Sequence, residues 1–131
     1  MNTIMVATNF SPLNEKLIDL AQVFTSTVYL LHVVLPNEDI SYRDKKEMGQ
    51  EFAEESSALN EQAQQLRHQG IETHALLLEG IATVAILEEA DRLSADLIVL
   101  GGVGKRRSTV LGDDLVHKIV KQSQRPVLVL P

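Results

Sequence analysis

Cysteine is absent from this chain, which excludes disulfide bonds and thiol chemistry. No apolar run reaches the ~18–20 residues that a membrane-spanning helix needs. The opening segment MNTIMVATNF holds no basic residue and no apolar stretch typical of a signal peptide, and we expect it to contain the first strand of the fold. From these absences we expect a cytoplasmic protein that makes no membrane contact.

Positive charge is also scarce, with 12 lysines and arginines against 18 aspartates and glutamates. The net charge of −6 argues against general nucleic-acid binding. The histidines share no metal-ligand spacing, so we expect no metal site; they are His32, His68, His74 and His117. No serine–histidine–aspartate arrangement and no pair of carboxylates occurs in a loop expected to face a cleft, so no catalytic residue is expected.

Apolar segments alternate between strand and helix patterns along the whole chain, which is expected to form one domain over residues 1–131. Strands are expected at residues 3–8, 28–35, 71–78, 96–100 and 126–130, and helices at 12–24, 44–69, 81–93 and 113–123. Gly70 is well suited to end the second helix. This alternation predicts a doubly wound, three-layer α/β sandwich with one parallel sheet of five strands and four helices. Such sheets bind ligands beyond the carboxyl ends of their strands, where the strand order reverses.

The loop after the fourth expected strand has the sequence GGVGKRRSTVLGDD at residues 101–114. It contains glycines followed by a run of basic residues. It is not a Walker A loop, because Arg106 follows its glycine–lysine pair where serine or threonine is required. It is not the dinucleotide fingerprint either, because Arg107 stands in place of the third glycine and the fingerprint follows a first strand.

The residues of this loop leave two interpretations open. Lys105, Arg106 and Arg107 could hold a phosphate, although a solvated turn is the commoner role of such a run. Gly101 could admit a phosphate to the backbone or simply relieve crowding at the end of a strand. Asp113 has a structural explanation, because an acid at the start of a helix stabilises it by about 0.3–1 kcal/mol.

Several segments in sequence order resemble the universal stress protein family. VATNFS is similar to the family's VATDFS, VYLLHVV to its second strand, and ADLIVLGGVG to its ADLIVMGSxG. LGDDLVHKIVKQSQRPVLVLP resembles its closing helix and strand, LGSVAxxV followed by PVLVV. The resemblance covers the whole chain and implies the strand order 3-2-1-4-5. It also implies a cytoplasmic stress-response regulator.

ATP-binding members of that family hold the nucleotide with a G-x2-G-x9-G-[ST] loop after the fourth strand. The resemblance therefore implies candidate nucleotide-binding residues, namely Ala7, Thr8, Asn9, Val33, Leu100, Gly101, Gly104, Lys105, Arg106, Gly112 and Asp113. This chain departs from the pattern, because only seven residues separate Gly104 from Gly112 and Asp113 replaces the serine or threonine. Asn9 also replaces the family's first-strand aspartate. ATP, ADP and AMP are all candidate ligands, with AMP or ADP bound at least as well as ATP.

The last expected strand is uncharged and falls at the sheet edge in the family's strand order, which predicts a homodimer. The candidate interface residues are Val127, Leu128, Val129 and Leu130. Two functions remain open: a weak nucleotide-binding regulator, and a nucleotide-free module acting through dimerisation and an unknown protein partner. An enzyme is not expected; the resemblance allows at most slow ATP hydrolysis or self-phosphorylation. Ser108 and Thr109 are candidate phosphorylation sites.

Overall fold

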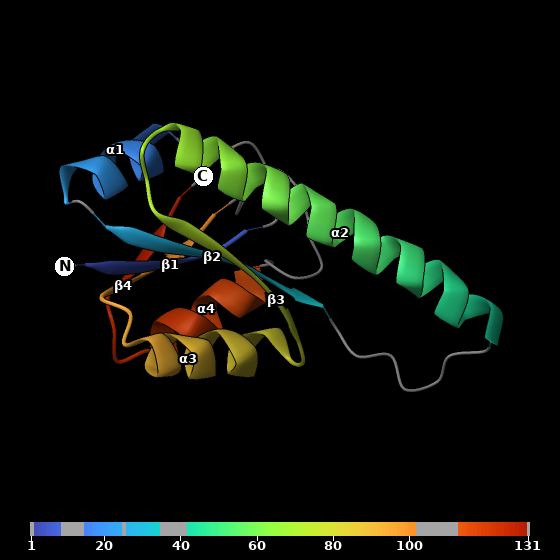
Figure 1. Cartoon of the computed structure of the whole chain (residues 1–131). Coiled ribbons are helices and arrows are strands. Elements are labelled where there is room, and N and C mark those ends of the chain that lie inside the picture. The colour runs from blue at the N-terminus through green and yellow to red at the C-terminus, as the bar shows by residue number, and fades with distance from the viewer. Residues whose placement is uncertain (1, 9–14, 25, 35–41, 102–112, 131) are drawn as a thin grey trace.

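The computed structural model describes residues 2–8, 15–24, 26–34, 42–101 and 113–130, including side chains except at 42–52 and 113. Strands and helices alternate through these residues (Figure 1). The elements are β1 (Thr3–Ala7), α1 (Glu15–Val23), β2 (Thr27–Val34), α2 (Tyr42–His68), β3 (Thr73–Glu79), α3 (Ala82–Leu93), β4 (Leu97–Leu100), α4 (Asp113–Gln122) and β5 (Val127–Val129).

The strands form one sheet with the order β3-β2-β1-β4-β5, and every neighbouring pair is parallel. The order and the parallel pairing confirm the expected doubly wound fold. β1 lies at the centre, and β3 and β5 form the two edges. Among the described helices, none has the length and apolarity to cross a membrane.

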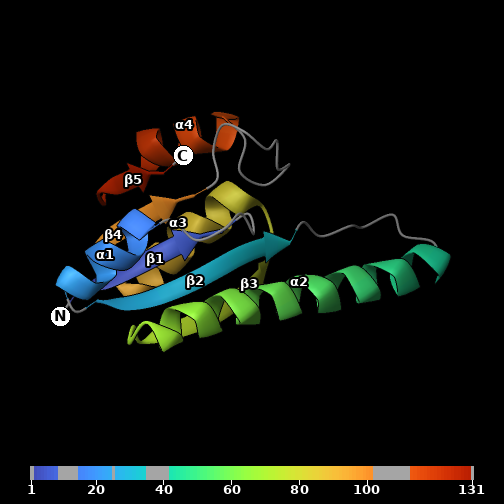
Figure 2. The ribbon, with the colours of Figure 1, turned by 90° about the horizontal axis from the view of Figure 1, so that it is seen from above.

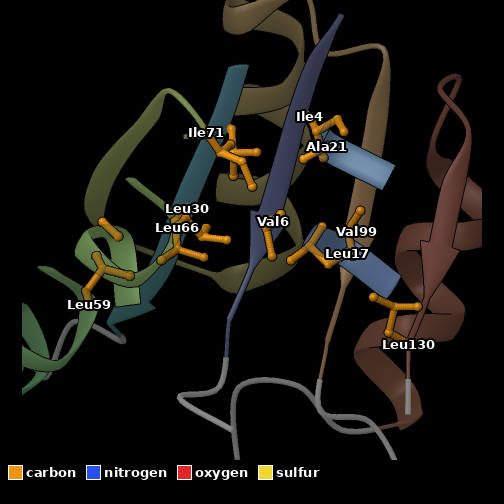
Figure 3. Close-up of a cluster of buried hydrophobic side chains, with 12 residues drawn as sticks. Ile4, Val6, Leu17, Ala21, Leu30, Leu59, Leu66, Ile71, Val99 and Leu130 are labelled. Atoms are coloured by element: carbon orange, nitrogen blue, oxygen red, sulfur yellow. The ribbon is translucent and has the colours of Figure 1, made fainter. Parts of the chain in front are cut away.

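Helices cover both faces of the sheet, with α1 and α2 on one face and α3 and α4 on the other (Figures 1 and 2). Successive side chains of a strand point to opposite faces. In β1, Ile4 and Val6 therefore join the cluster under α1 and α2, whereas Met5 and Ala7 join the cluster over α3 and α4. Figure 3 shows the first cluster, in which Leu66 and its neighbours lie over the central strands. Because both faces are buried, the central strands are mainly apolar, and His32 in β2 is a buried exception.

The end of α2 depends on a glycine, as expected from the sequence. Gly70 has φ of +80°, in the left-handed region, and its amide donates to the carbonyl of Arg67 at 2.9 Å. The amide of Ile71 donates back to the carbonyl of Leu66 at 3.2 Å, which turns the chain towards β3. This turn brings the C-terminal half of α2 down onto the sheet.

Gly70→Ala is expected to lower the free energy of unfolding by about 1–2 kcal/mol, because alanine is strained at this φ. A Cβ at Gly70 would meet no atom within 4 Å, so the cost comes from the backbone alone. Gly70→Asn should cost less, since asparagine tolerates the left-handed region. Calorimetric unfolding of both variants checks this; an equal loss for alanine and asparagine would contradict the backbone explanation.

Candidate functional site

The carboxyl ends of β1 and β4 meet at the centre of the sheet, where Ala7 pairs with Leu100. The strand order reverses at this point, because β2 lies on one side of β1 and β4 on the other. From β1 the chain continues to α1 on one face, and from β4 to α4 on the opposite face. Figure 3 shows the strand of Val6 beside the strand of Val99 as they run to this end. The arrangement is the topological switch point at which doubly wound folds bind ligands.

The candidate side chains at the strand ends are directed into the protein. Ala7, Val33 and Leu100 are buried in the cluster against α3 and α4, and Thr8 is buried as well. Gly101 is partly exposed, and its amide lies 3.4 Å from the carbonyl oxygen of Ala7. The buried side chains thus form the floor of the switch point, and a ligand here would meet mainly backbone groups.

Part of the expected site falls beyond what the structure describes. Asn9, Gly104, Lys105, Arg106 and Gly112 lie outside the described residues, as do Arg107, Ser108 and Thr109. Asp113 is the first residue of α4, which places it at a helix start as expected. In the described ranges, no group of three or more histidine, aspartate or glutamate side chains could hold a metal ion.

A buried polar network adjoins the switch point on the α2 face, and the sequence analysis missed it. The side chain of His32, in β2, is 6% exposed, and its Nδ1 lies 3.2 Å from the carbonyl oxygen of Thr8. The ring Nε2 lies 3.6 Å from Oε2 of Glu55, in α2. The Thr8 hydroxyl donates to Oε1 of Gln62, also in α2, at 2.8 Å. Thr8, the residue after β1, is therefore linked twice to the same helix.

The helix pattern carried a signal for this network. Glu55 and Gln62 are seven residues apart and share the helical face of Leu59 and Leu66, which pack on the sheet. Polar groups on such a face must find hydrogen-bond partners when buried. His32, inside an otherwise apolar strand, is the matching signal on the sheet.

A hollow lies at the opposite end of the sheet from the switch point, at the amino ends of β1 and β4. Its volume is about 260 Å³, and it is lined mainly by apolar groups, including Ile4, Leu20, Phe24 and Leu97. It is remote from the carboxyl ends of the strands, where doubly wound folds bind ligands. We therefore do not assign a nucleotide to it.

The fold and its switch point place the chain among the doubly wound α/β proteins. A model of the Universal stress protein family matches residues 1–131. Universal stress protein Sll1654 of Synechocystis sp. is 33% identical over 119 residues, which cover 89% of this chain and 74% of that protein. Universal stress protein MJ0531 of Methanocaldococcus jannaschii is 32% identical over 124 residues, which cover 86% of this chain and 69% of that protein. The chain belongs to the universal stress protein family.

Solved structures share the fold over almost the whole chain. Hypothetical protein MJ0577 aligns with 99% of this chain and 96% of its own, at 25% identity and a TM-score of 0.78. A universal stress protein in complex with cAMP aligns with 98% of this chain and 94% of its own, at 21% identity and a TM-score of 0.69. A universal stress protein from Archaeoglobus fulgidus in complex with dAMP aligns with 98% of this chain and 97% of its own, at 18% identity and a TM-score of 0.70.

Proposed function

We propose that this protein is a dimeric, cytoplasmic stress-response regulator whose switch point binds an adenine nucleotide weakly. The observation that carries the proposal is the pairing of Ala7 with Leu100 at the point where the strand order reverses. Gly101 follows directly, and in the sequence it begins the glycine pattern completed by Gly104 and Gly112. Backbone N–H groups in a glycine loop and at a helix start are suited to phosphate.

Two structural neighbours support the choice of ligand, because one is in complex with cAMP and the other with dAMP. Both ligands are adenine nucleotides with a single phosphate. A site for a single phosphate needs no hydrogen-bond donor at the positions that the outer phosphates of ATP would occupy. That chemistry agrees with a loop in which Asp113 replaces the family's serine or threonine.

The alternative is a nucleotide-free module that acts only through dimerisation and a protein partner. It is favoured by the seven-residue interval between Gly104 and Gly112, which is two residues shorter than the family pattern. In that case the exposed apolar side chains of Leu128 and Val129 would serve the function, and the switch point would not. We propose no catalytic turnover for either alternative.

Gly101→Val is expected to weaken AMP binding by about tenfold or more with little loss of stability. A Cβ at Gly101 would meet no atom within 4 Å, so the fold has room for the first atom of a side chain there. The same side chain would occupy space above the strand ends, where we place the phosphate. Calorimetric titration with AMP measures the affinity, and thermal unfolding checks the fold.

Mass spectrometry of freshly purified, denatured protein provides an independent measurement, because any AMP or ADP that co-purifies is released and identified. If the wild type carries no nucleotide and binds no AMP at millimolar concentration, the nucleotide-free alternative is correct. If AMP binds the wild type and Gly101→Val equally well, the nucleotide lies elsewhere.

A further inference from the structure

We infer that His32 is a positioning residue that connects the nucleotide site to helix α2. It would hold the chain at the end of β1 and transmit nucleotide occupancy to the helix through Glu55. The inference rests on the proposed nucleotide binding and adds a route by which that binding reaches another surface.

Thr8 is the residue at which the chain leaves the sheet. Its amide still follows the strand pattern and donates to the carbonyl of Leu31 at 2.9 Å. Its carbonyl oxygen receives the Nδ1 contact of His32 at 3.2 Å. Because a carbonyl can only accept, Nδ1 must carry the proton in this contact. His32 therefore holds the peptide group between Thr8 and the following residue.

The second ring nitrogen of His32, Nε2, faces helix α2. Nε2 lies 3.6 Å from the carboxylate of Glu55, whose side chain is 29% exposed, whereas that of His32 is 6% exposed. A buried ring that donates to Thr8 through Nδ1 and faces Glu55 with Nε2 has little freedom to rotate, so a displacement of the Thr8 carbonyl also displaces the contact with Glu55. The Thr8–Gln62 hydrogen bond forms a second, separate link to α2.

Helix α2 has one part packed on the sheet and one part that projects from it. Its C-terminal half packs on the sheet through Leu59, Ala63 and Leu66. Its N-terminal turns project beyond the sheet, as Figures 1 and 2 show. We place the response to nucleotide in this helix.

The two links of His32 can be separated by a pair of substitutions. In His32→Asn, the amide N–H₂ can reproduce the Nδ1 donor to Thr8 but does not reach Glu55. In His32→Gln, the longer side chain can reproduce the Nε2 position and loses the contact with Thr8. Both remove the same ring from the same buried position, so a purely structural role would affect them alike.

His32→Gln is expected to weaken AMP binding by about fivefold, which corresponds to the loss of one hydrogen bond. His32→Asn should keep the affinity within about twofold of the wild type. AMP should slow amide exchange around Glu55 and Gln62 in the wild type. In both variants the effect around Glu55 should be lost, while the effect around Gln62 persists. Calorimetry and amide exchange followed by NMR make the two measurements.

Glu55→Gln is a second test that leaves the buried ring in place, and it should behave like His32→Asn. His68→Asn and His68→Gln serve as controls, because His68 is exposed at the far end of α2. An equal loss of AMP affinity in both His32 variants would overturn the inference, as would unchanged protection around Glu55 in both. A wild type that binds no AMP would instead overturn the proposed function, and the inference with it.

Discussion

Replacing Asp113 by serine is expected to strengthen ATP binding by about one to three orders of magnitude, and to change AMP binding by less than about tenfold. Asp113 is the first residue of α4, where helix N–H groups and the helix dipole would otherwise attract phosphate. A carboxylate can only accept hydrogen bonds, so it offers a phosphate oxygen no donor. It also repels the phosphate through its charge.

The size of the effect follows from the charge. Two like charges at about 4 Å cost about 1–4 kcal/mol, depending on screening, and each 1.4 kcal/mol is about tenfold in affinity. In the site we propose, the single phosphate of AMP would lie further from the helix start than the outer phosphates of ATP, so it should experience less repulsion. We therefore expect the wild type to bind AMP or ADP at least as tightly as ATP, and Asp113→Ser to reverse that order.

Calorimetry with AMP, ADP and ATP on the wild type and on Asp113→Ser tests this expectation. Asp114→Ser is the matched control, because it removes the same charge one residue further along the exposed start of α4. Full recovery of ATP binding should also require two residues inserted between Gly104 and Gly112. Sub-micromolar ATP binding by the wild type, unchanged in Asp113→Ser, would show that the loop is not impaired.

The layered fold was predictable because local patterns determine it. β2 is apolar on both faces and therefore had to be an inner strand between two helix layers. Near the start of β3, by contrast, buried Ile71 and Thr73 alternate with exposed Glu72 and His74, as expected at an edge. The strand order itself does not follow from local pattern. It came from the family resemblance, and the structure confirms it.

The switch point was predictable from the sequence, whereas the contacts beside it were not. Alternation and strand order are enough to put Ala7 beside Leu100 at the switch point. The link from Thr8 through His32 to α2 depends in addition on the register of β1 against β2 and on the rotation of α2 about its axis. Neither quantity is encoded within one segment, because each depends on how two distant segments pack.

Val129→Lys is expected to convert a homodimer into a monomer. β5 forms one edge of the sheet, and Leu128 and Val129 are its exposed large apolar side chains. Leu130, also a candidate interface residue, is already buried in the core of the single chain. A lysine charge enclosed in an interface without a partner costs roughly 3–5 kcal/mol, which weakens dimerisation by about a hundredfold or more.

The two sheet edges differ in a way that favours β5 as the dimer strand. β3, at the other edge, carries exposed Glu79, and a charged side chain on an edge strand discourages pairing with another chain. β5 has the sequence VLV and no charged residue. Antiparallel pairing of two β5 strands about a twofold axis would give the backbone groups at the β5 edge of each subunit hydrogen-bond partners. It would also join the two sheets into one.

Light scattering during gel filtration measures the outcome directly. The wild type at micromolar concentration should have twice the chain mass of 14.5 kDa, and Val129→Lys should have the chain mass. Val23→Lys is the matched control, because Val23 is 75% exposed and ends α1, which is not an edge strand. It should remain dimeric, since the same charge placed there stays in water. A monomeric wild type would contradict the proposed dimer. Dissociation of the dimer by Val23→Lys and not by Val129→Lys would show that the interface lies at α1.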